Sequence, residues 1–147
     1  YGSYVAGMAF SNVGLGIIHS MAHPLGARFD VPHGVANALL LPYVMEYNKN
    51  ACLKKYGDIA RAMGVDIKGM TELEAANSAI EAVKKLSLDI GIPQTIKELK
   101  KRGTDEVLIK KDDLKQLSED AFIDPCTGGN PRQTSVEDIL ELYNIAY

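Results

Sequence analysis

Three histidines, His19, His23 and His33, all lie within residues 14–34, and no other stretch of the chain gathers so many groups able to do chemistry. His19 and His23 are four residues apart, so on a helix they stand one above the other on the same face. His33 lies between a proline and a glycine, directly before a new apolar run. Neutral imidazole binds zinc, iron, copper and nickel. The spacing predicts that the three imidazoles converge and could hold a divalent metal ion.

Alternatives stay open for the same residues. A histidine on an apolar helix is often a packed, hydrogen-bonded core residue, and the pattern alone does not separate that role from metal binding. Asp30 is a further carboxylate near the histidines. A site in which all three histidines bind one ion, with water as the fourth ligand, would be typical of a metallohydrolase.

Helices are expected to position these histidines. Residues 4–23 are rich in Gly, Ala and Ser and are apolar nearly all round, which predicts a buried helix. Pro24 is expected to end or kink that helix, because it lacks an N–H and disfavours helical geometry in the residue before it. Residues 34–49 predict a second apolar helix, with a kink at Pro42.

The sequence patterns predict helices in the rest of the chain as well. Helices are predicted over residues 51–63, from a capping box at Thr71 and Glu74 to about residue 90, from residue 111, and after an N-cap at Thr134 or Ser135. The basic residues of 97–102 are expected on a solvated face. No convincing alternating strand and no repeat appears, so the predicted fold class is all-α, a helical bundle.

Composition narrows the class of protein. The length of 147 residues indicates one domain, and the formal net charge of −3 disfavours binding to nucleic acid or an anionic membrane. No run of about eighteen apolar residues predicts a membrane span. The two cysteines, Cys52 and Cys126, form no Cys-x-x-Cys motif, which argues against a disulfide scaffold or zinc ribbon and fits a reducing cytoplasm. A glycine-rich dinucleotide loop after a strand is also missing.

Two motifs carry a family resemblance. The pattern of Gly16, His19, Ala22, His23 and Gly26, followed by Pro32-His33-Gly34, resembles the histidine signature of the iron-containing (group III) alcohol dehydrogenases. The segment Asp124-Pro125-Cys126-Thr127-Gly128-Gly129-Asn130-Pro131-Arg132 is similar to the C-terminal segment of that family, above all in its lactaldehyde reductase and propanediol dehydrogenase branch. The motifs occur in the family's order and the likeness runs over essentially the whole chain.

The resemblance implies roles for particular residues. In the family an Asp and three His hold the metal, usually iron(II) and sometimes zinc. His19 and His33 match two of those ligands, whereas Asp30 does not match the aspartate. His23 matches a histidine near the nicotinamide, a candidate for proton relay and cofactor positioning. Cys126 becomes a candidate substrate-pocket residue.

The resemblance also implies a wider organisation. Residues 1–147 would form the all-helical metal-binding domain of an enzyme whose dinucleotide-binding domain, with the other two ligands, lies upstream. The whole enzyme would transfer a hydride between NAD or NADP and a short-chain alcohol or aldehyde. This chain alone would be inactive, and the enzyme would be a candidate homodimer. The alternatives are a catalytically silent helical domain for dimerisation or partner binding, and the three-histidine metallohydrolase.

Overall fold

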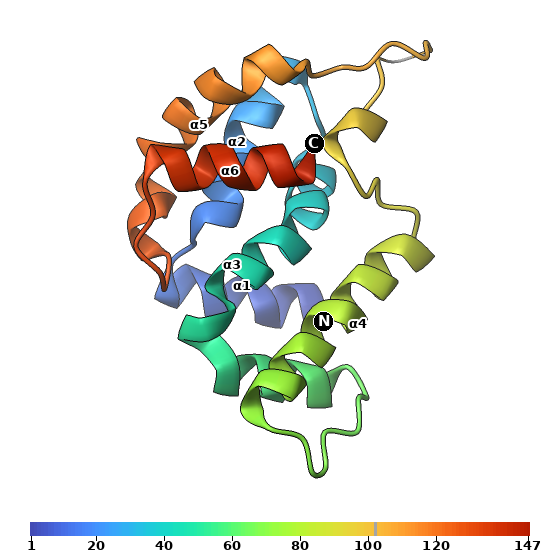
Figure 1. Ribbon diagram of the computed structural model, residues 1–147, viewed down its shortest axis with the longest axis vertical. Coiled ribbons are helices and arrows are strands. Elements are labelled where there is room, and N and C mark those ends of the chain that lie inside the picture. The colour runs from blue at the N-terminus through green and yellow to red at the C-terminus, as the bar shows by residue number, and fades with distance from the viewer. Residues whose placement is uncertain (102) are drawn as a thin grey trace.

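Six α-helices make up most of the computed structural model, which describes residues 1–101 and 103–147 (Figure 1). In the described part only an isolated bridge between Lys100 and Val107 pairs extended backbone, and no strand forms. The predicted all-α class is confirmed. The helices are α1 (Gly2–Val13), α2 (Ile17–Phe29), α3 (His33–Ala62), α4 (Glu72–Asp89), α5 (Leu114–Phe122) and α6 (Val136–Ala146), with short 3-10 helices η1 (Ile96–Glu98), η2 (Lys111–Asp113) and η3 (Pro125–Gly129).

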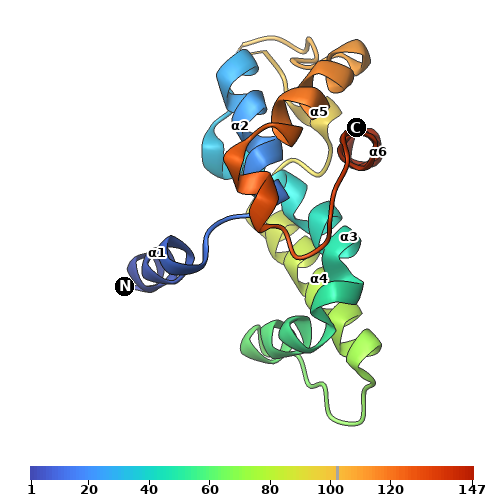
Figure 2. The same cartoon turned by 90° about the vertical axis from the view of Figure 1, so that its left-hand side faces the viewer.

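The helices enclose two apolar clusters. The larger cluster joins α2, the first half of α3, α5 and α6, and its largest fully buried side chains include Met21, Leu40, Leu117 and Tyr143. The smaller cluster lies between α3 and α4, which run side by side in both views (Figures 1 and 2). The histidine-bearing end of α2 is therefore embedded in the larger core, which fixes the helix backbone beneath the three imidazoles.

The expectation of one buried helix over residues 4–23 is wrong. Gly14 ends α1 with a φ of 82°, a left-handed conformation that glycine adopts without steric cost, and α2 begins only at Ile17. The axes of α1 and α2 differ by 108°. No residue of α1 is buried, and Figure 2 shows this helix standing apart from the body of the molecule. The all-round apolar pattern of this segment therefore does not correspond to burial within the chain.

Pro24 does not end α2, so that half of the expectation that Pro24 ends or kinks the helix is wrong. The helix continues to Phe29 and stops at Asp30, whose φ of 56° places it in the left-handed region. Pro24 itself is buried, and the side chains of Ala22 and Leu25 on either side are fully buried. Packing of both turns against the core offsets the hydrogen bond that the proline cannot donate. Asp30 is exposed and serves as the helix end.

The break in α3 lies at Cys52 rather than at Pro42. Cys52 has φ −132° and ψ 17°, outside helical geometry, whereas the helix runs through the buried Pro42. This break separates the segments predicted as two helices. The expected helix starts are confirmed: Thr71 and Glu74 form a reciprocal capping box on α4, and Ser135 forms one with Asp138 on α6.

The lysines of the basic stretch near residue 100 lie on the surface. Lys97, Lys100 and Lys101 are exposed as expected, and Arg102 lies outside the described residues. Within the described ranges, no single helix is long and apolar enough to cross a membrane; α1 and α2 pass that test only when counted together across their bend.

Candidate functional site

The three histidine rings converge at the junction of α2 and α3. The ring centroids of His19 and His23 lie 6.0 Å apart, those of His19 and His33 5.4 Å, and those of His23 and His33 5.6 Å. His19 and His23 come from successive turns of α2, and His33 is the first residue of α3, brought back by the left-handed turn at Asp30. The prediction that all three imidazoles meet is confirmed.

The surroundings of His19 lower its pKa and so favour the neutral ring that a metal requires. Partial burial lowers the pKa of His19, the nearby His33 and His23 lower it further, and Asp124 opposes this weakly. A lowered pKa favours the neutral ring, whose free nitrogen can bind a metal without first losing a proton. The donor chemistry of His19 therefore fits a divalent metal ion.

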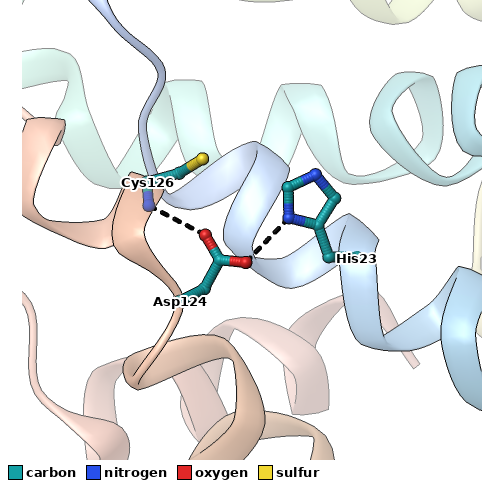
Figure 3. A group of neighbouring side chains, drawn as sticks. All are labelled: His23, Asp124 and Cys126. Atoms are coloured by element: carbon teal, nitrogen blue, oxygen red, sulfur yellow. Dashed lines mark hydrogen bonds and ion pairs between the residues drawn. The ribbon is translucent and has the colours of Figure 1, made fainter.

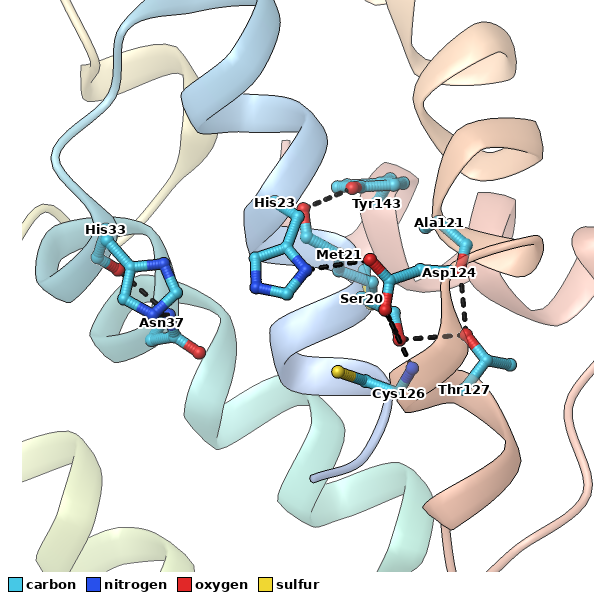
Figure 4. Close-up of polar contacts among 10 residues, drawn as sticks. All are labelled: Ser20, Met21, His23, His33, Asn37, Ala121, Asp124, Cys126, Thr127 and Tyr143. Carbon is cyan, nitrogen blue, oxygen red and sulfur yellow. Dashed lines mark hydrogen bonds and ion pairs between the residues drawn. The ribbon is translucent and has the colours of Figure 1, made fainter. Parts of the chain in front are cut away.

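Asn37 orients His33 from one turn further along α3. Its side-chain amide donates to the His33 carbonyl oxygen at 2.9 Å, and the same nitrogen lies 3.2 Å from His33 Nε2 (Figure 4). An amide N–H at Nε2 favours the ring form with a lone pair on that nitrogen. Asn37 thus ties its side chain to the first residue of α3. Its Oδ1 is buried without a partner in the described part of the chain.

His23 is paired with a carboxylate from the far end of the sequence. Nδ1 of His23 lies 2.8 Å from Oδ2 of Asp124, which caps the start of η3 (Figure 3). The side chain of Asp124 is only 15% exposed, against 41% for His23. Burial alone would raise the pKa of Asp124, but hydrogen bonds from His23 and from the backbone of Cys126 outweigh it and hold the pKa below its usual range. Asp124 is therefore an ionised partner for His23.

A small polar network holds Asp124 in place. Its Oδ1 accepts a hydrogen bond from the Cys126 backbone N–H at 2.8 Å and lies 3.4 Å from Ser20 Oγ. Thr127 Oγ1 lies 2.8 Å from Ser20 Oγ and 2.7 Å from the Ala121 carbonyl oxygen (Figure 4). Ser20 is fully buried on α2, so the network ties η3 to the helix that carries His23.

Cys126 lies beside this pair, on η3. The ligand atoms of His23, Asp124 and Cys126 fall within 4.8 Å of one another, a spacing that a metal ion could bridge. Burial raises the pKa of the Cys126 thiol, and the neighbouring Asp124 raises it further. Metal ligation requires the thiolate, and the oxygens of Asp124 are already engaged. This trio is better described as a hydrogen-bonded wall of the site than as a metal centre.

Residues 130–132 anchor the loop between η3 and α6 to α3. The side-chain amides of Asn130 and Asn48 exchange two hydrogen bonds, at 2.9 and 2.8 Å. Arg132 stacks its guanidinium on the Tyr47 ring at 3.9 Å and donates to the Tyr47 carbonyl oxygen. Among the described residues, no carboxylate forms an ion pair with Arg132.

Sequence reasoning missed Asp124, Ser20 and Thr127 as members of the site. One local signal was available: an Asp followed by Pro125 is typical of a capped helix start. It predicts the cap but not the pairing with His23, which lies 101 residues away. A separate hollow of about 440 Å³ lies between α3, α4 and α6, and none of the three histidines lines it.

Comparisons with known proteins place the same family over essentially the full chain. Residues 1–147 match the family model described as Fe-containing alcohol dehydrogenase family, C-terminal. The chain is 53% identical to lactaldehyde reductase of Escherichia coli (strain K12) over 99% of its length, and 44% identical to 1,3-propanediol dehydrogenase of Klebsiella pneumoniae over 100%. A crystal structure of 1,3-propanediol oxidoreductase superposes with a TM-score of 0.89, at 43% identity, over 97% of this chain and 35% of that one.

The match covers only part of those proteins. This chain spans 36% of the length of both curated relatives. The six-helix fold, the converging histidines and the family model nevertheless agree from end to end. The chain belongs to the Fe-containing alcohol dehydrogenase family and corresponds to its C-terminal domain.

Proposed function

We propose that this chain is the metal-binding helical domain of an NAD(P)-linked alcohol dehydrogenase or aldehyde reductase acting on short-chain substrates. The observation that carries the proposal is the convergence of His19 and His33, 5.4 Å apart between ring centroids, from the two helices that meet at Asp30. The relatives named above, a lactaldehyde reductase and a 1,3-propanediol dehydrogenase, support the substrate class. The nicotinamide would be bound mainly by an upstream dinucleotide-binding domain.

His19 and His33 are the residues of this chain that would hold the metal, with iron(II) favoured over zinc by the family's description. The lowered pKa of His19 favours its neutral ring, the donor form that iron(II) and zinc accept, and the Asn37 amide beside Nε2 orients the ring of His33. A bound divalent cation supplies Lewis acidity, which polarises a carbonyl and makes an alcohol easier to deprotonate. The remaining ligands would come from the upstream domain.

His23 would move the proton and help to position the cofactor. Its Nδ1 is paired with Asp124, which leaves the other ring nitrogen free to exchange a proton with the substrate. The hydride chemistry itself belongs to the nicotinamide. Cys126, next to Asp124 and kept as a neutral thiol by its raised pKa, would line the substrate side of the site.

Metal content tests this proposal directly. Mass spectrometry after anaerobic reconstitution with iron(II) or zinc would compare this chain with the same chain joined to its upstream domain. We expect one metal per joined protein, weak retention by the chain alone, and loss of metal in His19→Ala and His33→Ala. His23→Ala is the matched control, because it removes a neighbouring imidazole while leaving both expected ligands.

The outcomes separate the alternatives. Stoichiometric binding by the chain alone that requires all three histidines would overturn the split site and favour a self-contained, metallohydrolase-like centre. A joined protein that binds metal but does not oxidise NADH or NADPH with short-chain aldehydes would indicate a catalytically silent domain.

A further inference from the structure

We propose that Asp124 is a positioning residue that holds His23 in the tautomer with its proton on Nδ1, so that the unprotonated Nε2 is the atom that takes the substrate proton. This inference rests on the proposed function and deepens it. It assigns to a residue of the C-terminal segment a role that acts entirely through His23.

The first step is the direction of the hydrogen bond. Oδ2 of Asp124 lies 2.8 Å from Nδ1 of His23. An ionised carboxylate only accepts hydrogen bonds, so the proton between them belongs to Nδ1. In a neutral ring the lone pair then resides on Nε2. Figure 4 shows the opposite edge of the ring facing the side on which His33, one of the two expected metal ligands, lies.

The second step is the rigidity of the carboxylate. Asp124 caps η3 through the Cys126 N–H and is followed by Pro125, which fixes the backbone at the start of that turn. Thr127 links the same turn to Ser20, one helical turn before His23 on α2. In the described part of the chain, Asp124 is also the one hydrogen-bond partner of the His23 ring. Among the hydrogen bonds of the described residues, this contact alone fixes which nitrogen of the ring carries the proton.

The proton and electrons balance in the direction of alcohol oxidation. The alcohol O–H proton passes to Nε2 of His23, the hydride leaves the carbinol carbon for the oxidised nicotinamide, and the C–O bond becomes a carbonyl. The ring is then an imidazolium, with Nδ1–H still bonded to the Asp124 carboxylate, whose negative charge stabilises it. Aldehyde reduction runs the same transfers in reverse.

Nuclear magnetic resonance tests the tautomer without any requirement for activity. This chain has three histidines, so ¹⁵N-histidine labelling, with His23→Ala for assignment, resolves the His23 nitrogens. At a pH where free imidazole is neutral, we expect the Nδ1–H form. In Asp124→Asn the new amide can donate to Nδ1, and we expect the Nε2–H form to become populated. An unchanged Nδ1–H form in Asp124→Asn would overturn the proposal.

Kinetics in the joined, metal-loaded protein test the consequence. Asp124→Asn is expected to lower kcat about 10²-fold or more, the scale of a lost proton-transfer group, while metal content is unchanged. Asp124→Glu keeps the carboxylate and is expected to retain more kcat than the Asn variant. The double variant with His23→Ala should lose no more than His23→Ala alone, since Asp124 acts through that ring. Additive losses would overturn the proposal.

A matched control distinguishes positioning from general stabilisation. Asp120→Asn removes a carboxylate of the neighbouring helix α5, where Asp120 pairs with Arg28 on the surface at 2.5 Å. We expect it to leave the His23 tautomer and kcat unchanged. If the unsubstituted joined protein shows no dehydrogenase activity, the proposed function fails, and the resonance experiment still decides the role of Asp124.

Discussion

Asn48 and Asn130 hold each other through a reciprocal pair of amide hydrogen bonds, although they lie 82 residues apart. Asn48 is buried in the middle of α3, and Asn130 follows directly after η3. The third bond of Asn130, to the Arg132 carbonyl oxygen at 2.7 Å, closes the loop that leads to α6. This pair anchors the segment that places Asp124 beside His23.

Replacing Asn130 should therefore destabilise the fold as well as the loop. Asn130→Ala leaves the buried amide of Asn48 without its partner, so we expect the free energy of unfolding to fall by about 1–3 kcal/mol. Urea unfolding followed by circular dichroism measures this as a lower midpoint. Asn144→Ala is the matched control, because Asn144 is exposed and, among the described residues, its side chain bonds only to the Leu140 carbonyl oxygen of its own helix. Equal losses in the two variants would contradict the anchoring role.

A second prediction concerns two adjacent glycines of η3. A Cβ on Gly129 would lie against the carbonyl oxygen of Leu15, deep inside van der Waals contact, whereas a Cβ on Gly128 would meet nothing within 4 Å. Backbone atoms cannot move aside as a flexible side chain can. We expect Gly129→Ala to cost about 1–3 kcal/mol of unfolding free energy, the range typical of overpacking.

Thermal unfolding of both variants measures the difference. Gly128→Ala adds the same methyl group to open space and should leave Tm nearly unchanged. A normal Tm for Gly129→Ala would show that the close approach of η3 to the junction of α1 and α2 is not required.

A third prediction concerns the buried hydroxyl of Tyr143. It donates to the Met21 carbonyl oxygen at 2.6 Å and connects α6 to α2 two residues before His23. Tyr143→Phe removes this buried hydrogen bond, while the Met21 carbonyl oxygen keeps its partner within α2, and we expect a loss of about 0.5–1.5 kcal/mol in urea unfolding. Tyr47→Phe removes a hydroxyl that bonds the Gln133 carbonyl oxygen at an exposed position, where water can replace it. A loss for Tyr47→Phe as large as for Tyr143→Phe would argue against the importance of burial.

Local rules predicted much of this structure from the sequence. Helical spacing placed His19 and His23 on one face, and capping rules located the start of α4 at Thr71. Both depend on residues within four positions of each other. The rules failed at Pro24, because the packing of α2 against the larger core outweighs the local penalty of a proline.

The candidate site also contains a part that local sequence predicts and a part that it does not. Its three histidines could be found because they are close in sequence and because an imidazole side chain is a common metal ligand. The contact between His23 and Asp124 joins residues 101 positions apart and exists only because α5 and η3 pack against α2. A single sequence contains no signal for that packing, so the carboxylate was recognised within a motif but its partner was not.

The last prediction is the acid dependence contributed by Asp138 at the start of α6. The Ser135 backbone N–H donates to this carboxylate at 2.9 Å and, as the largest cause, lowers the pKa of Asp138 below its usual value. A folded-state pKa below the unfolded value means that the stabilisation is fully present above about pH 4 and is lost as the pH falls through the folded pKa. Asp138→Asn should therefore lower the unfolding free energy at neutral pH and flatten its decline in acid.

Chemical unfolding at a series of pH values from neutral down to about pH 2 measures that slope. Glu137→Gln is the matched control: Glu137 occupies the same first helical turn, is exposed, and accepts no hydrogen bond in the described structure. Both substitutions remove one negative charge near the helix N-terminus, so the macrodipole contribution is similar in the two. If the unfolding free energy declines less with falling pH in Asp138→Asn than in Glu137→Gln, the difference comes from the capping hydrogen bond. Identical profiles of the two variants would assign the effect to the helix dipole alone.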